Sequence, residues 1–372
     1  MQLDGCNCIK IYGPNLKHFH FDGEFADVCF IDAPHLSYVS ITLYGDVGDQ
    51  HFGQGKVSNL VRVLGCLTAL EKLVIGECFM EFLAMGILPK RLLVTYDRLK
   101  SISLFINFND LNQSLAMLFL FQSSPNLQEL KMLVSTSDSY ILVANQVAAT
   151  KYVVDFWKAL GHLNCSMNHL RMVKIIMWGA KSELELIKFL LANSPVLEIL
   201  SVNHITSEKV DESRVLKELV RFPRASTKAQ IEYKIHQMSS LHKMETPHRR
   251  SSDIISNLPD QVIETILAYW PIQDAVQTSL LSNKWRYKWN LIPTLVFHEE
   301  RTHFPPDTKA FASNKIVNFV DRVLLQHKGS IHKFELSTHS LQDYVIDSWL
   351  LFLSKNGVKE LVLQFLSRDR YC

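Results

Sequence analysis

The sequence predicts an α/β fold in which short parallel strands stack side by side as a solenoid and helices form the returns. Three observations support this prediction. Large apolar residues recur with one spacing along most of the chain, several of these groups open with Pro-x-Leu, and amphipathic helical stretches separate them. A small three-helix module and a short second repeat arc follow in the last third of the chain.

The recurring spacing is L-x-x-L-x-L, with any large apolar residue at the three marked positions. Alternate residues of a strand share one face, so each unit needs neighbours to cover its apolar side. The steps between matches are uneven, and several exceed the usual length of about 20–29 residues, so the pattern indicates an irregular leucine-rich repeat. A generic α/β domain with a parallel sheet is the alternative. The matches are Leu16/Phe19/Phe21, Leu36/Val39/Ile41, Leu70/Leu73/Ile75, Leu99/Ile102/Leu104, Leu127/Leu130/Met132, Leu170/Val173/Ile175, Leu197/Leu200/Val202, Ile331/Phe334/Leu336 and Val358/Leu361/Leu363.

One return helix has clear end signals. Ser182 and Glu185 fit a capping box, in which the two residues satisfy backbone groups at the helix start. Asn193-Ser194-Pro195 stops the helix, because proline disfavours helical backbone in the residue before it. The inner stripe of this helix is Leu184, Ile187, Leu190 and Leu191.

The same region carries a family resemblance. Val173-Lys174-Ile175, Gly179 and the run from Glu183 to Glu198 resemble the FBD domain, which closes many plant F-box/leucine-rich-repeat proteins. The segment Arg221-Phe222-Pro223-Arg224-Ala225-Ser226 fits the end of that domain. The resemblance implies a terminal repeat region and does not imply a biochemical role for it.

The helical module occupies residues 253–298. Leu258-Pro259 opens its first helix, where proline is tolerated because its missing N–H has no helical partner there. An apolar stripe follows, Pro271 breaks it, and Ala275 to Ser282 suits a second short helix. Trp285 and Trp289 lie four residues apart on one face of a third. Three helices this short leave apolar surface exposed, which predicts a partner protein.

The module resembles an F-box through its Leu-Pro opening, its Ala-Val-x-Thr-Ser-x-x-Ser core and its Trp-Arg-x-x-Trp close. The resemblance implies the substrate-receptor subunit of an SCF-type ubiquitin ligase. In that role the F-box binds a Skp-type adaptor and through it a cullin, and the repeats bind an unknown target protein. The residues expected to form the docking module are Leu258, Pro259, Ile266, Leu267, Val276, Ser279, Leu280, Trp285 and Trp289.

The order of these parts differs from the usual F-box, repeats, FBD. We expect leucine-rich repeats over residues 1–165, an FBD-like terminal region over 166–238, a polar linker over 239–252, the F-box over 253–298 and a truncated second arc over 299–372. The order suggests two adjacent related genes joined as one, or else a genuinely rearranged protein. If two genes are joined, we expect residues 1–240 and 253–372 to fold separately. We also expect Glu360–Phe365 to be an open strand edge.

Composition narrows the functional class. The chain has 372 residues, 47% of them hydrophobic, and a formal net charge of +2, which gives no strong attraction to nucleic acid or to an anionic membrane. The absence of a signal peptide and the scattered cysteines suggest the cytoplasm or the nucleus.

Gly53-Gln54-Gly55-Lys56 lacks the flanking glycine and the Ser or Thr of a phosphate loop. We therefore expect no enzyme, no metal and no cofactor. The rival to a ligase subunit is an interaction scaffold, or a fusion product that never joins a ligase.

Overall fold

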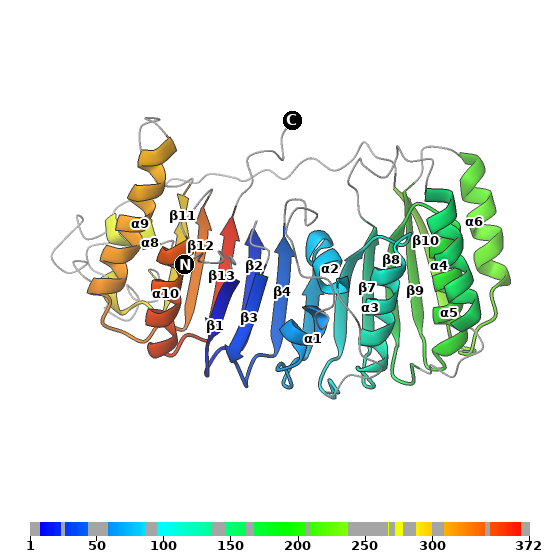
Figure 1. The fold of residues 1–372 in the computed structure, drawn as a ribbon, viewed down its shortest axis with the longest axis horizontal. Helices are drawn as coiled ribbons and strands as arrows, with labels where there is room; N and C mark the ends of the chain where they lie inside the picture. The colour runs from blue at the N-terminus through cyan, green and yellow to red at the C-terminus, as the bar shows by residue number, and fades with distance from the viewer. Residues whose placement is uncertain are drawn as a thin grey trace, which may run out of the picture. The chain divides into compact units, whose positions relative to one another are not determined.

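The computed structural model describes residues 8–23, 27–43, 59–85, 95–134, 146–160, 167–205, 209–236, 267, 272–277, 288–299, 309–338 and 343–365 (Figure 1). The chain divides into two compact units. One consists of Ser37–Lys243, and the other combines Met1–Leu36 with Met244–Cys372. Among the described residues, no helix has the length and apolar character that crossing a bilayer requires.

The unit formed by Ser37–Lys243 has a parallel sheet whose strands pair in chain order. Helices α3, α4 and α5 lie along one face of this sheet (Figure 1). The strands are β4 (Tyr38–Leu43), β5 (Lys72–Ile75), β6 (Ser101–Ile106), β7 (Glu129–Val134), β8 (Met172–Met177), β9 (Ile199–Ile205) and β10 (Gln230–His236). The helices are α1 (Asn59–Leu64), α2 (Glu77–Ala84), α3 (Leu111–Gln122), α4 (Gln146–Leu160), α5 (Lys181–Asn193) and α6 (Lys209–Arg221).

The other unit has a parallel sheet with the order β11, β12, β13, β2. A two-stranded parallel ribbon, β1 with β3, covers β2 on the core side, where Phe30 packs edge-on against Phe19 with ring centroids 5.4 Å apart. Its elements are β1 (Cys8–Tyr12), β2 (His18–Gly23), β3 (Asp27–Asp32), α8 (Ile272–Gln277), the 3-10 helix η4 (Lys288–Leu291), β11 (Thr294–His298), α9 (Lys309–Gln326), β12 (Lys333–Thr338), α10 (Asp343–Lys355) and β13 (Glu360–Phe365).

The predicted fold class is confirmed, because the repeat positions form the core. In all nine predicted units the three marked apolar residues are buried, and none is more than 4% exposed. Two further units escaped the sequence pattern. Ile292, Leu295 and Phe297 form one around β11, and they are buried as well. The other surrounds β10, where Ser226 takes the first apolar position and its hydroxyl donates to the Leu197 carbonyl at 2.7 Å.

The expectation that β13 is an open edge is wrong. It pairs in parallel register with β2, from Glu360 beside His18 to Gln364 beside Asp22. The N–H groups of Lys17 and His18 donate to the Lys359 carbonyl at 2.8 and 3.0 Å. A strand with unpaired backbone N–H and C=O groups and uncovered apolar side chains favours pairing with another strand. The N-terminal repeat supplies one, so β2 continues the arc that follows the helical module. The unit that holds this arc therefore draws residues from both sides of the linker, and the separate folding of the two sides stays a prediction.

Candidate functional site

The described part of the helical module packs directly onto the repeat arc. Helix α8 contacts both β11 and η4. Its Gln273 Nε2 donates to the His298 carbonyl of β11 at 3.1 Å. The carbonyl of Trp289 accepts a hydrogen bond from the N–H of Ile292 at 3.2 Å. Ile292 is the first apolar position of the repeat unit around β11. The module therefore ends inside the first repeat, with no linker between them.

Three of the nine predicted docking residues lie in the described part of the chain. Leu267 is helical and fully buried, and Trp289 in η4 is 5% exposed. Val276 in α8 is partly exposed. The other six lie outside the described residues: Leu258, Pro259, Ile266, Ser279, Leu280 and Trp285. The prediction that these nine residues form the docking module, some facing the adaptor and some holding the helices together, therefore stays a prediction.

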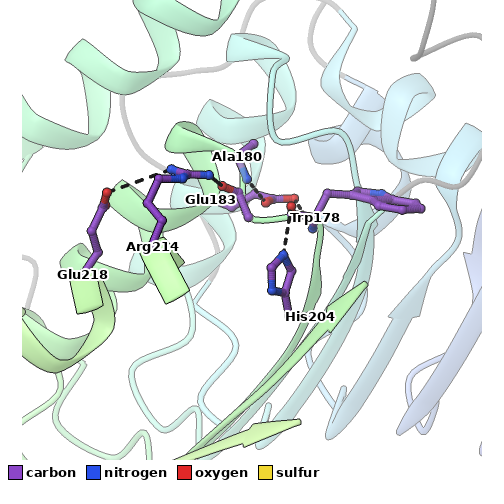
Figure 2. Close-up of polar contacts among 7 residues, drawn as sticks. Trp178, Ala180, Glu183, His204, Arg214 and Glu218 are labelled. Atoms are coloured by element: carbon purple, nitrogen blue, oxygen red, sulfur yellow. Dashed lines mark hydrogen bonds and ion pairs between the residues drawn. The ribbon is translucent and has the colours of Figure 1, made fainter. Parts of the chain in front are cut away.

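A second cluster forms where β8 turns into α5, around the carboxyl group of Glu183 (Figure 2). Glu183 is 3% exposed. Its Oε1 accepts the Trp178 N–H at 3.2 Å and its Oε2 accepts the Ala180 N–H at 2.6 Å. The Gly179 N–H also bonds to this carboxylate. Burial raises the pKa of Glu183 to about 7, although the three backbone N–H groups act in the opposite direction.

This geometry corrects the predicted capping box. Helix α5 has Ala180 at its N-cap, and alanine has no side-chain acceptor, so only the returning half of a box exists. Ser182 lies inside the first turn and donates to Asn109 Oδ1 at 2.9 Å. Glu185 lies near Lys188, with 3.8 Å between Oε2 and Nζ. The helix starts two residues earlier than the Ser-x-x-Glu pattern suggests, and Glu183 caps it.

His204 and Arg214 hold the same turn from its other side. His204 is fully buried at an inward position of β9. Its Nε2 lies 3.1 Å from the Trp178 carbonyl and its Nδ1 lies 2.6 Å from the Tyr233 hydroxyl. A carbonyl can only accept, so Nε2 donates to it, and in the neutral ring this leaves Nδ1 to accept from the tyrosine hydroxyl. Arg214 Nη2 donates to the Gly179 carbonyl at 3.0 Å (Figure 2).

Position 179 in this cluster requires glycine. Its φ of +82° lies in the left-handed region that side chains disfavour. A Cβ there would lie 2.8 Å from Val215 Cγ2 and 2.9 Å from His204 Nε2. The sequence resemblance had pointed to Gly179 and Glu183. It had not indicated His204, which looks like an ordinary residue within a strand.

Comparison with known proteins assigns both regions. The FBD family model matches residues 161–202, which include Trp178, Gly179 and Glu183. The F-box domain model matches residues 255–295. The chain carries an F-box and an FBD. The F-box match extends into β11, and the FBD match ends within β9.

The relatives are plant proteins. An F-box/FBD/LRR-repeat protein of Arabidopsis thaliana is 50% identical over 115 residues, which are 31% of this chain and 27% of that protein. Two F-box/LRR-repeat proteins of the same plant are 37% and 38% identical over 115 and 120 residues. These alignments cover 30% and 31% of this chain, and 30% and 23% of the relatives. The chain thus spans less than a third of the length of these relatives, and the predicted resemblance is confirmed.

The buried carboxyl group predicts a pH-dependent stability. Because the pKa of Glu183 is raised from 4.5 to about 7 on folding, the folded state binds this proton more tightly than the unfolded state. The resulting stabilisation is complete below pH 4.5 and is lost as the pH rises to about 7. It amounts to a few kcal/mol, since one pKa unit corresponds to about 1.4 kcal/mol.

We therefore expect the stability difference between the wild type and Glu183→Gln to change between pH 4.5 and 7.5, because glutamine does not titrate. Denaturant unfolding at a series of pH values measures it. Glu185→Gln on the same helix is the control and should follow the wild type. A difference that is constant with pH would show that Glu183 remains ionised throughout.

Proposed function

We propose that this chain is the substrate-receptor subunit of an SCF-type ubiquitin ligase. The F-box binds a Skp-type adaptor, the adaptor binds a cullin, and the repeats bind the target protein. Ubiquitin transfer takes place on other subunits, so this chain positions the target and does not catalyse. We place the complex in the cytoplasm or the nucleus.

The observation that carries this proposal is the junction of the F-box match with the repeat arc. Residues 255–295 run into β11, and α8 is bonded to that strand through Gln273. A receptor has to hold its target at a fixed distance from the adaptor, and a rigid junction does this better than a flexible linker. The domain boundaries expected from the sequence are part of this proposal.

Burial divides the docking residues into two groups. Leu267 and Trp289 are buried, so we assign them to the packing of the module. Val276 is partly exposed on α8, so we assign it to the adaptor interface. Leu258 and Pro259 lie outside the described residues, and we assign them to the same interface from the F-box resemblance alone. Interfaces concentrate their binding energy in a few apolar anchors, so these residues should matter more than the polar rim.

Binding of the full chain to a purified plant Skp-type adaptor tests the proposal. We expect a stable complex in size-exclusion chromatography, and we expect the double variant Leu258→Ala, Pro259→Ala to weaken it by at least about tenfold, which is about 1.4 kcal/mol. Val276→Asp should have a similar effect, because it places a charge in an apolar contact. Tyr152→Ala, an exposed aromatic on α4, is the matched control. No complex with the wild-type chain, or equal binding by all variants, would favour the scaffold alternative.

A further inference from the structure

The sheet of Ser37–Lys243 carries an apolar row on the face that points away from its core. Phe105 on β6, Leu133 on β7 and Ile176 on β8 are register partners. All three are partly exposed and alternate with buried core residues. Adjacent strands lie about 4.8 Å apart, so the three side chains are direct neighbours. We call Phe105, Leu133 and Ile176 the apolar row.

Trp178 extends this row beyond the end of β8. It lies two residues after Ile176, and it is 41% exposed. Its backbone is fixed on both sides, since its N–H donates to Glu183 and its carbonyl accepts from His204. Figure 2 shows its indole pointing away from that cluster. The buried polar cluster therefore holds an exposed tryptophan in place, which is the property of a preorganised binding anchor.

Two lysines lie beside the row on the same face. Lys131 and Lys174 are register partners on β7 and β8, two residues before Leu133 and Ile176. The register partner of Lys131 on β6 is Ser103, and the register partner of Lys174 on β9 is Ser201. The four residues paired across β6, β7, β8 and β9 at this level therefore include no carboxylate. Lys131 lies 3.1 Å from Glu129, and Lys174 is exposed. Like charges directly opposite each other destabilise a sheet, so folding alone does not favour this pair.

On the corresponding sheet face of the other unit, a lysine is neutralised by carboxylates of the chain itself. There Lys333 lies between two glutamates, with its Nζ 3.1 Å from Glu335 and 2.8 Å from Glu360. The lysine on β12 is thus matched by carboxylates on its own strand and on β13. Among the described residues, the Lys131–Lys174 pair has one carboxylate in contact, Glu129. The next carboxylate along the register is Glu232 on β10, beyond Ser201. An anionic group from outside the chain would complete this charge pattern.

We propose that the apolar row, Trp178 and the Lys131–Lys174 pair bind a short acidic segment of a target protein. Such a segment places a large apolar side chain against Trp178 and the row, and its Asp or Glu carboxylates against the two lysines. Nucleic acid fits less well, because Leu133 and Ile176, two of the three residues of the apolar row, are aliphatic and offer no ring on which a base stacks. The inference builds on the proposed receptor role and gives the target a chemistry.

Selection from a phage-displayed library of random peptides, with the purified full chain as bait, tests this proposal. We expect enriched sequences to combine Asp or Glu with Trp, Phe or Leu. Synthetic copies should bind in calorimetry, more weakly as salt is added. Trp178→Ala and Lys174→Glu should each reduce their affinity at least about tenfold. Tyr152→Ala and Lys188→Glu, the same changes on the helix side, should leave it unchanged.

Three outcomes would overturn the proposal: no enrichment, enrichment of basic peptides, or equal losses in the test and control variants. Tighter binding of a mixed-sequence single-stranded oligonucleotide that is lost in Lys174→Glu would overturn it in favour of nucleic acid. Adaptor binding is measured on the same variants. Its retention together with failed peptide binding would reject this surface alone, and its absence in the wild type would reject the receptor role.

Discussion

Phe21→Ala is expected to cost about 3–5 kcal/mol of stability, the usual cost of removing a buried phenylalanine ring. Phe21 on β2 has no exposed surface. Its ring lies 5.6 Å from that of Phe365 and 6.4 Å from that of Phe19, and its register partner is Leu363 on β13. The loss should therefore appear in strands near the other end of the sequence.

Hydrogen exchange of the backbone amides measures this effect. Protection should fall in β12 and β13 as well as in β2, because these strands belong to one sheet. Tyr12→Ala is the matched control, since Tyr12 is an aromatic of the same N-terminal segment that is 49% exposed. Protection of β13 that is unchanged in Phe21→Ala would mean that β2 and β13 do not pair in solution.

Gly179→Ala should destabilise the buried polar cluster around Glu183, which we call the FBD cluster, by about 3 kcal/mol. A left-handed backbone costs an L-residue about 1–2 kcal/mol, and overpacking a tight site adds about 1–3 kcal/mol. The new methyl group would meet Val215 and His204, and neither yields easily. Valine is stiff at χ1, and the histidine ring is held by hydrogen bonds at both nitrogens.

Gly357→Ala separates these two contributions. Gly357 has a similar φ of +75°, but a Cβ there meets nothing within 4 Å. Its substitution should cost only the backbone term, about 1–2 kcal/mol. Thermal unfolding of both variants gives the comparison. Equal losses would show that the Gly179 site has room for a methyl group and that the cluster is less tightly packed than the distances indicate.

The repeats could be predicted from sequence because the signal is local. The apolar positions of a unit such as Leu197, Leu200 and Val202 lie within six residues and all point into the core. The unit around β11 was hidden, because Ile292, Leu295 and Phe297 follow directly on the F-box motif and were assigned to its tail. The unit around β10 was hidden because Ser226 and Ala229 replace large apolar residues.

The FBD cluster depends on contacts that a linear pattern does not contain. Glu183 looks like one more carboxylate near a helix start, and only the turn at Gly179 aims three N–H groups at it. His204 is recognisable only from the register, which places it at the inward position after Val202, beside Met177. The F-box motif, by contrast, was recognisable as a family pattern, although six of its nine expected docking residues lie outside the described part of the chain.

The pairing of β2 with β13 could not be predicted, since it joins strands from nearly opposite ends of the sequence. It bears on the unusual order of the parts. The β2 repeat continues the arc that begins at the F-box, so in that unit the spatial order is F-box, then repeats, as in the familiar arrangement.

The same pairing places a constraint on how the protein is made in the cell. The ribosome adds about 5–20 residues per second, so β2 is finished on the order of tens of seconds before β13 exists. Throughout that interval Phe19 and Phe21 have no strand on the β13 side to pair with. The unit therefore completes its sheet only late in synthesis, and substitutions in β2 should lower the yield of native chain through aggregation during translation as well as through equilibrium stability.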